Sequence, residues 1–209
     1  MPRAARSSAT LNRDVFINCP FDEAYGELFR AIVFTVHACG FRSRCALEHG
    51  PNGALRLDTL TQLIASADRG IHDLSRIELS EPAGTPRFNM PFELGVSVGA
   101  ARFGGRRQRR KQLLVLARNR GQWQPSVSDL SGLDPQFHND DPHTVIKHVR
   151  DFLKGGGERR PGASAIAQDY EAFSADLPSL AKQARQTLPE AREYLNFVEF
   201  VAEYFSEAK

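Results

Sequence analysis

The sequence predicts a parallel α/β domain followed by a helical segment. Short β-rich runs alternate at least three times with helical patterns, and the most apolar run, QLLVLA (112–117), has the character of an interior strand. A glycine-rich break, GGGERRPG (155–162), separates these from the helical end of the chain. Strand and helix in alternation are typical of a parallel sheet with right-handed crossovers.

The first half of the chain is expected to hold three strands and two helices. DVFIN (14–18) is the first strand, and residues 22–39 have helical spacing, with Asp22 as cap and Gly40 as stop. FRSRCALE (41–48) is expected to be the second strand. The amphipathic helix 56–67 and the strand RGIHDLS (69–75) follow; the helix has one apolar face, formed by Leu57, Leu60, Leu63 and Ile64.

The second half begins with a long loop at 76–88, which contains a glycine and two prolines. The helix 89–103 follows, with Pro91 in its first turn. After the strand 112–117, residues 118–141 are expected to be irregular, and the helix 144–153 to close the domain.

The predicted organisation is a flexible start (1–13), an α/β domain (14–154), a linker (155–162) and a helical segment (163–209). The last segment is expected to form two helices, 164–187 and 190–207. Residues 194–205 of the second helix give it an apolar face too large to leave in water. That face either covers the main domain or pairs with another chain.

Composition excludes several classes of protein. The chain has 209 residues, 41% of them hydrophobic and 25% charged, as in an ordinary soluble domain. Its net charge of +2 gives no reason to expect nucleic acid as the main partner. The three cysteines form no CxxC pair, which indicates reduced thiols. Without a signal peptide or an apolar run of the ~20 residues that a membrane span requires, the expected location is the cytoplasm.

Three segments are expected to meet at the carboxyl ends of the strands, where open parallel sheets bind ligands. They are NCPFDEAY (18–25), HDLSR (72–76) and FNMPFELG (88–95). The last places the carboxylate of Glu93 in the first turn of a helix, beside Gly95, which would allow close approach of a ligand. Alternatively, Glu93 merely favours a helix N-terminus through the macrodipole. The apolar neighbours of Glu93 favour the functional interpretation.

The runs DVFINCPFD, ADRGIHDLSR and NMPFELGVSVGAARFG resemble the superfamily that joins nucleoside 2-deoxyribosyltransferases with TIR and TIR-like domains. The resemblance covers roughly residues 14–117 and implies a flavodoxin-like core. It also implies cleavage of the N-glycosidic bond of a nucleoside, a nucleotide or NAD, with the helix-start glutamate attacking or stabilising the anomeric carbon. That role falls on Glu93.

The same resemblance implies the contacts of the substrate. Asp73 and Asn89 would hold the ribose or the base, and Phe21 and Phe88 would wall the pocket. Deoxyribosyltransferases usually carry an aspartate at the position of Arg87, so this departure favours the TIR-like side of the superfamily. The complete predicted binding set is Asn18, Pro20, Phe21, Asp73, Ser75, Arg76, Arg87, Phe88 and Asn89.

The predicted chemistry suits a single carboxylate. Breaking a C–N glycosidic bond builds an oxocarbenium-like cation, which a neighbouring carboxylate stabilises or traps. The nicotinamide of NAD leaves as a neutral base and needs no general acid. We therefore expect no cofactor and no metal, with NAD or a nucleotide entering as the substrate.

Other motifs receive smaller roles. The histidines show no metal-ligand spacing; His37 is expected to be structural, and His72 adjoins the proposed site. Cys19 also lies beside the site but has no histidine partner in its motif. Arg76 and Arg87 could hold a phosphate. The basic cluster RRQRRK (106–111) either stabilises a helix C-terminus or contacts phosphate or nucleic acid.

The leading hypothesis is therefore an N-glycosidase or NAD hydrolase of TIR-like type, for which the resemblance suggests a role in antiphage defence. One alternative is a nucleotide sensor that binds without turnover and signals to a partner protein through the C-terminal helices. A further alternative is an interaction protein with a degenerate pocket. Self-association into a dimer or larger oligomer is expected from the resemblance and from the aromatic face at 194–205.

Overall fold

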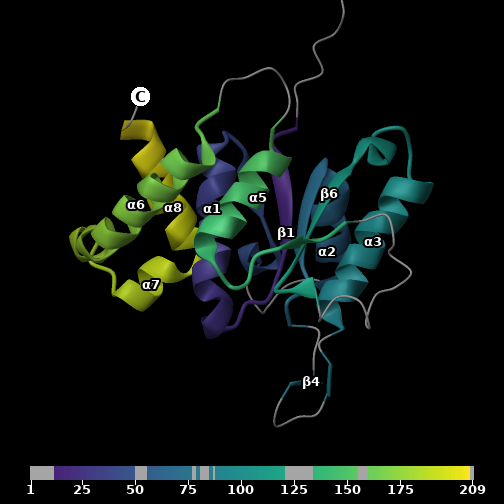
Figure 1. The fold of residues 1–209 in the computed structure, drawn as a ribbon, viewed down its shortest axis with the longest axis horizontal. Coiled ribbons are helices and arrows are strands. Elements are labelled where there is room, and N and C mark those ends of the chain that lie inside the picture. Colours follow the sequence, from purple (N-terminus) through teal and green to yellow (C-terminus); the bar gives the residue numbers. More distant parts are fainter. Residues whose placement is uncertain are drawn as a thin grey trace, which may run out of the picture.

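The computed structural model describes residues 12–49, 56–76, 79–80, 85–86, 88–120, 134–154 and 160–207. Most of the predicted flexible start, Arg87, and residues 155–159 of the predicted linker lie outside these ranges. The described residues form an α/β structure with a parallel sheet at its centre (Figure 1). Three further helices follow the last helix of the α/β domain.

The sheet has five strands in the order β2-β1-β3-β6-β7, and every pair of neighbours is parallel. This order is consistent with a flavodoxin-like layout. The predicted strands at 14–18 and 112–117 are confirmed without change. The strands are β1 Asp14–Asn18, β2 Arg42–Arg44, β3 Arg69–Asp73, β6 Gln112–Ala117 and β7 Gln136–Phe137.

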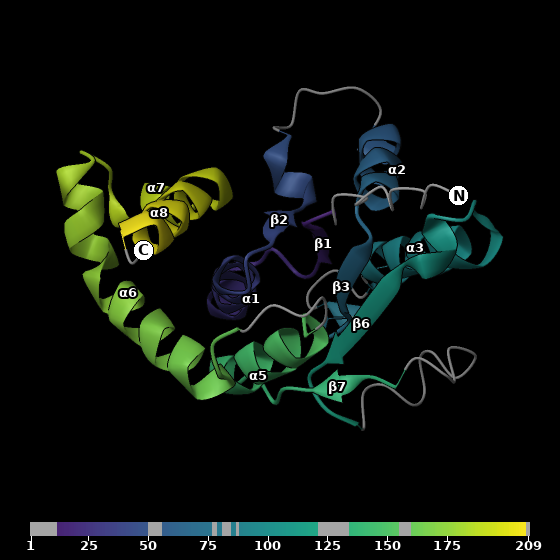
Figure 2. The ribbon, with the colours of Figure 1, turned by 90° about the horizontal axis from the view of Figure 1, so that it is seen from above.

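Helices cover both faces of the sheet, as Figure 2 shows: α1 and α5 lie on one side, and α2 and α3 on the other. Along β1, Val15 and Ile17 pack in the core with α1, whereas Phe16 packs with Leu60 and Leu63 of α2. The predicted helix 89–103 is confirmed at both ends. The four helices are α1 Gly26–Ala38, α2 Arg56–Ser66, α3 Asn89–Phe103 and α5 Pro142–Phe152.

Several expected boundaries are wrong. The predicted strand 41–48 ends at Arg44, because the next residues form a 3₁₀ turn, η2 Ala46–Glu48, closed by Glu48 bonding back to the backbone of Cys45. The predicted loop 76–88 contains a small antiparallel hairpin, β4 Leu79–Ser80 with β5 Thr85–Pro86. It projects from the carboxyl edge of the sheet, at the bottom of Figure 1. The region 118–141 contains the short edge strand β7, which has too few residues to show a pattern.

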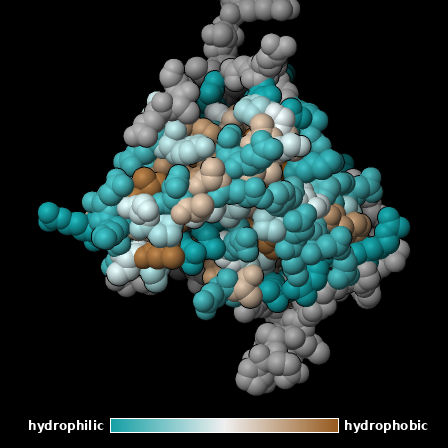
Figure 3. Space-filling view, turned by 60° about the vertical axis from the view of Figure 1, so that its left-hand side comes forward, coloured by the Kyte–Doolittle hydropathy of each residue, from teal (hydrophilic) through white to brown (hydrophobic). Residues whose placement is uncertain are grey.

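The C-terminal segment forms α6 Ala163–Gln183, α7 Leu188–Arg192 and α8 Tyr194–Glu207. The single helix predicted over 190–207 is therefore divided at Glu193, which has an extended backbone. A capping box between Thr187 and Glu190 starts α7. These helices lie outside α1, and the surface seen from their side is mostly hydrophilic (Figures 2 and 3).

The position of the C-terminal helices explains the burial of α1. All six residues at 31–36 have no exposed surface, so α1 is enclosed on every side rather than along one stripe. Phe34 is the centre of this packing. Its ring lies 5.0–5.8 Å from the rings of Tyr170, Phe173, Tyr204 and Phe205. The apolar face predicted at 194–205 is thus used to cover the main domain.

Among the described residues, no helix is both long and apolar enough to cross a membrane.

Replacing Phe34 with alanine should lower the free energy of unfolding by about 3–5 kcal/mol, because it empties a closed aromatic cluster. Urea denaturation followed by circular dichroism would measure the loss. Leu195→Ala is the matched control, because Leu195 lies on the same layer of helices but is 54% exposed, and its change should stay within about 0.5 kcal/mol. Similar losses in both variants would show that Phe34 does not anchor the C-terminal helices.

Candidate functional site

The candidate site lies at the carboxyl ends of β1 and β3. The chain runs from β1 to β2 on one side and later returns to place β3 on the other side of β1. This reversal of strand order is where parallel α/β sheets characteristically bind ligands. The start of α3 lies against the same point, because the Asn18 amide Nδ2 donates to the carbonyl oxygen of Met90 at 2.9 Å.

Asn18 and His72 form a buried pair at the ends of the two strands. Asn18 Nδ2 lies 3.0 Å from His72 Nδ1, in addition to its bond with Met90. An amide nitrogen is only a donor, so Nδ1 of His72 must accept, and the ring proton is on Nε2. The pair therefore connects β1, β3 and α3 through neutral hydrogen bonds.

His72 is enclosed by the protein. Its side chain has no exposed surface, and its Nε2 would lie 2.9 Å from a Cβ at position 70, which explains the glycine there. Burial, together with the positive charge of Lys111, lowers the pKa of His72 to about 3. At neutral pH His72 is an uncharged structural group.

Asp73 lies at the end of β3 and points to the opposite face of the sheet, toward α1 and α5. Its Oδ2 accepts a 2.6 Å hydrogen bond from the Tyr25 hydroxyl and lies 3.0 Å from His138 Nε2, and its Oδ1 accepts the backbone N–H of Ser75 at 2.8 Å. His138 Nδ1 accepts from the N–H of Asp140 at 3.0 Å, which leaves the ring proton on Nε2 to donate to Asp73.

The Asp73 carboxylate stays ionised in this environment. Burial alone would raise its pKa, but the interaction with His138, followed by hydrogen bonds from Ser75 and Tyr25, lowers the pKa below its ordinary value. Asp73, Ser75 and His138 each have at most 2% of their surface exposed. The cluster therefore holds three loops together and presents no acidic proton to a substrate.

Glu93 lies in the second turn of α3, not in the first turn as predicted, because the helix begins at Asn89. The macrodipole is strongest within the first turn, so this position weakens the alternative explanation of Glu93 as a charge that only stabilises the helix. The side chain is half-buried. It lies close enough to Cys19 for its charge to act on that thiol.

Cys19 is a buried thiol that remains protonated. Burial is the main cause that raises its pKa well above the ordinary value, followed by the nearby ionisable groups of Asp73, Cys45, Glu93 and Asp22. A protonated, buried thiol is a poor nucleophile. The electrostatic contributions also show that carboxylates from three segments surround this point.

The other predicted binding residues divide into exposed and enclosed groups. Phe21 is 41% exposed and Phe88 69% exposed, and Asn89 is also exposed. Arg76 is half-buried, with its Nη2 3.9 Å from Asp22 Oδ1 on the loop after β1. The enclosed residues are Asn18, Pro20, Asp73 and Ser75.

Two residues of the site were not predicted from the sequence. Tyr25 belongs to the segment 18–25 that was expected at this edge but was given no role there, and His138 lay in a region expected to be irregular. Both reach Asp73 from segments 48 and 65 positions away along the chain, as their numbers show. The asparagine and aspartates around His138, in QFHNDD (136–141), are turn-forming residues and were the available signal.

Within the ranges that the structure describes, no group of three or more histidine, cysteine or acidic residues could hold a metal ion. Comparisons of the chain with models of protein families, with curated proteins and with solved structures found no match.

Unfolding should take up a proton at His72, so its contribution to stability is present above pH ~6.5, the unfolded pKa, and is lost as the pH falls toward about 3. Between these values the wild type should lose about 1.4 kcal/mol per pH unit relative to His72→Gln. Glutamine retains an acceptor for Asn18 but does not titrate. Urea unfolding of both proteins at several pH values measures the difference, and a constant difference would contradict a buried neutral His72.

Proposed function

We propose that the chain is an N-glycosidase that cleaves the bond between base and ribose in NAD or a nucleotide, with Glu93 as the catalytic carboxylate. The observation that carries this proposal is the half-buried Glu93 in α3, at the reversal of strand order between β1 and β3. The strand order is also the one that a TIR-like, flavodoxin-like core would have, which supports the resemblance of the motifs.

The proposed reaction is a hydrolysis at the anomeric carbon. The C1′–N bond breaks, its electron pair leaves with the base, and the sugar passes through an oxocarbenium-like state. Glu93 stabilises this cation by its charge or bonds to it transiently. Water then supplies the hydroxyl group on C1′, and its remaining proton passes to solvent.

The environment of Asp73 favours a substrate whose base leaves without protonation. Asp73 is the second carboxylate of the predicted site, yet it is fully buried and its pKa is lowered by His138, Ser75 and Tyr25 against the effect of burial. It is unsuited to donate a proton as a general acid. The nicotinamide of NAD is neutral on departure, so NAD is the preferred substrate of this proposal.

Exposed residues around Glu93 supply the proposed substrate contacts. Phe21, Phe88 and Phe92 are 41%, 69% and 53% exposed and can pack against a base or a ribose. Asn89 is the proposed polar contact. Arg76, already near Asp22, is the proposed phosphate contact. Arg87 keeps the same proposed role but lies outside the described residues, and the enclosed Asn18 and Asp73 act by holding the loops in place.

A nucleotide sensor is the second candidate. The observation that favours it is again the closed Asp73 cluster, because an enzyme acting on ordinary nucleosides would need an acid to protonate the base. A sensor would use the same exposed contacts without turnover.

Glu93→Gln should lower the rate of base release by at least about 10²-fold, because the amide keeps the shape of the side chain but removes its charge. The assay is incubation of purified protein with NAD and a panel of nucleosides and nucleotides, followed by chromatography of the released base. Glu199→Gln is the control, because Glu199 is an exposed glutamate on α8. Full activity in Glu93→Gln would refute the assignment.

Calorimetry with the same compounds separates the two candidates. Tight binding of a nucleotide with no product after long incubation would identify a sensor. Product formation that depends on Glu93 would identify the enzyme.

Self-association remains a proposal that rests on the resemblance alone, since the aromatic residues of α8 pack against α1 instead of a second chain. A dimer or larger oligomer is expected by light scattering at micromolar protein. A monomeric mass would contradict it.

A further inference from the structure

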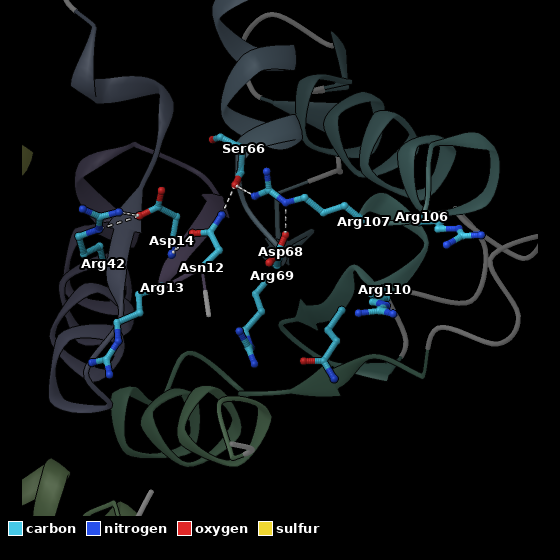
Figure 4. A pocket seen from close by; sticks show the side chains of 11 residues that line it. Asn12, Arg13, Asp14, Arg42, Ser66, Asp68, Arg69, Arg106, Arg107 and Arg110 are labelled. Atoms are coloured by element: carbon cyan, nitrogen blue, oxygen red, sulfur yellow. Dashed lines mark hydrogen bonds and ion pairs between the residues drawn. The ribbon is translucent and has the colours of Figure 1, made fainter. Parts of the chain in front are cut away.

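A second, strongly basic hollow lies at the opposite edge of the sheet, where the strands begin. Its volume is about 1310 Å³. It is formed by the amino ends of β1, β2, β3 and β6 together with the turn before β6. Eleven residues line this arginine groove (Figure 4): Asn12, Arg13, Asp14, Arg42, Ser66, Asp68, Arg69, Arg106, Arg107, Arg110 and Gln112.

Some basic residues of this edge serve the fold. Arg107 Nε bonds Asp68 Oδ1 at 2.8 Å, and Lys111 Nζ bonds the carbonyl oxygen of Ile64 at 2.7 Å, at the end of α2. Arg42 Nε bonds Asp14 Oδ1 at 2.8 Å. Arg107 Nη2 also bonds the carbonyl oxygen of Ser66, the last residue of α2. The expectation that RRQRRK stabilises a helix C-terminus therefore holds for Arg107 and Lys111, although the helix is α2.

Other arginines of the groove have no such use. Arg106 and Arg110 are exposed and form no ion pair with any residue that the structure describes. Arg69 Nε is buried and, within the described ranges, lacks a hydrogen-bond acceptor. Figure 4 shows the guanidinium of Arg69 between those of Arg13 and Arg110 in that view.

Positive side chains outnumber negative ones along the groove. Among the described residues of its lining, six are arginines and two are aspartates, while the whole chain carries a net charge of only +2. Arg69 and Arg160 both stack on the ring of Phe41, at 4.8 and 4.6 Å from its centroid. Burial and the nearby charge of Arg160 lower the pKa of Arg69. An anionic ligand would be attracted to several arginines held along one hollow.

The shape and chemistry of the groove indicate the ligand class. Four neighbouring strands span about 14 Å at ~4.8 Å per step, more than one phosphate group occupies. Guanidinium groups match phosphate oxygens with paired hydrogen bonds. Among the described residues of the lining there is no aromatic side chain on which a base could stack. The ligand is thus expected to present several phosphates in a row and to be held through them alone.

We propose that the arginine groove binds the phosphodiester backbone of nucleic acid without regard to sequence. This departs from the expectation drawn from the net charge of the chain, because the net value conceals how unevenly the charge is placed. The groove is at the edge opposite Glu93, so the inference does not rest on the proposed enzymatic function.

The test is fluorescence anisotropy of the full chain with labelled single-stranded DNA and RNA of about 20 nucleotides, as a function of salt. Arg106→Gln/Arg110→Gln removes two exposed groove charges that the fold does not use. The double variant should bind at least about 10-fold more weakly, and its slope of log K against log salt should be shallower by about 1.4, or 0.7 for each lost phosphate contact. Circular dichroism should show unchanged folding.

Lys182→Gln/Arg192→Gln is the matched control, because it removes two exposed charges from the C-terminal helices and gives the same net charge. It should bind like the wild type. An equal loss of affinity in the control would show that binding depends only on the overall charge of the protein, and it would overturn the proposal. Absence of oligonucleotide binding by the wild type at about 50 mM salt would also overturn the proposal. Binding of inorganic tripolyphosphate alone, with the oligonucleotides excluded, would replace it with a small-anion site.

Discussion

The Asp73 carboxylate is bonded from three separate segments, and the arrangement of the carboxyl edge depends on it. Tyr25 reaches it from the loop after β1, Ser75 from the turn after β3, and His138 from the loop before α5. A buried carboxylate is costly unless it is fully bonded, so removing one partner leaves a charge without compensation. The three loops can therefore shift only together.

The two faces of β3 carry side chains with different bonding partners. Asp73 faces α1 and α5, whereas His72, one residue earlier, faces α3 and bonds Asn18. Successive strand residues point to opposite faces, so neighbours in sequence serve different layers. Both side chains have a structural role, because their hydrogen bonds join separate segments of the chain. The proposed catalytic carboxylate, Glu93, lies on the third element of this edge, α3.

The two edges of the sheet differ in charge as well as in position. At the carboxyl edge, burial is the largest cause of the raised pKa of Cys19, and Asp73, Glu93 and Asp22 raise that pKa further. At the amino edge, six arginines line the groove. A parallel sheet produces this separation because all of its strands begin at one edge and end at the other. A molecule with a net charge of +2 can thus distribute its charged groups unevenly between the two edges.

Local patterns in the sequence were sufficient for the α/β class and for β1, α3 and β6. They also indicated that the segments after β1, at the end of β3 and at the start of α3 would meet, as the bonds of Asn18 with His72 and Met90 show. Periodicity and turn residues carry that information along a few neighbouring positions. Tertiary packing alone decided that Phe34 would be enclosed, that Asp73 would be held by Tyr25 and His138, and that arginines from four strand ends would meet. Those outcomes depend on segments far apart in the chain, and no local pattern records which of them will become neighbours.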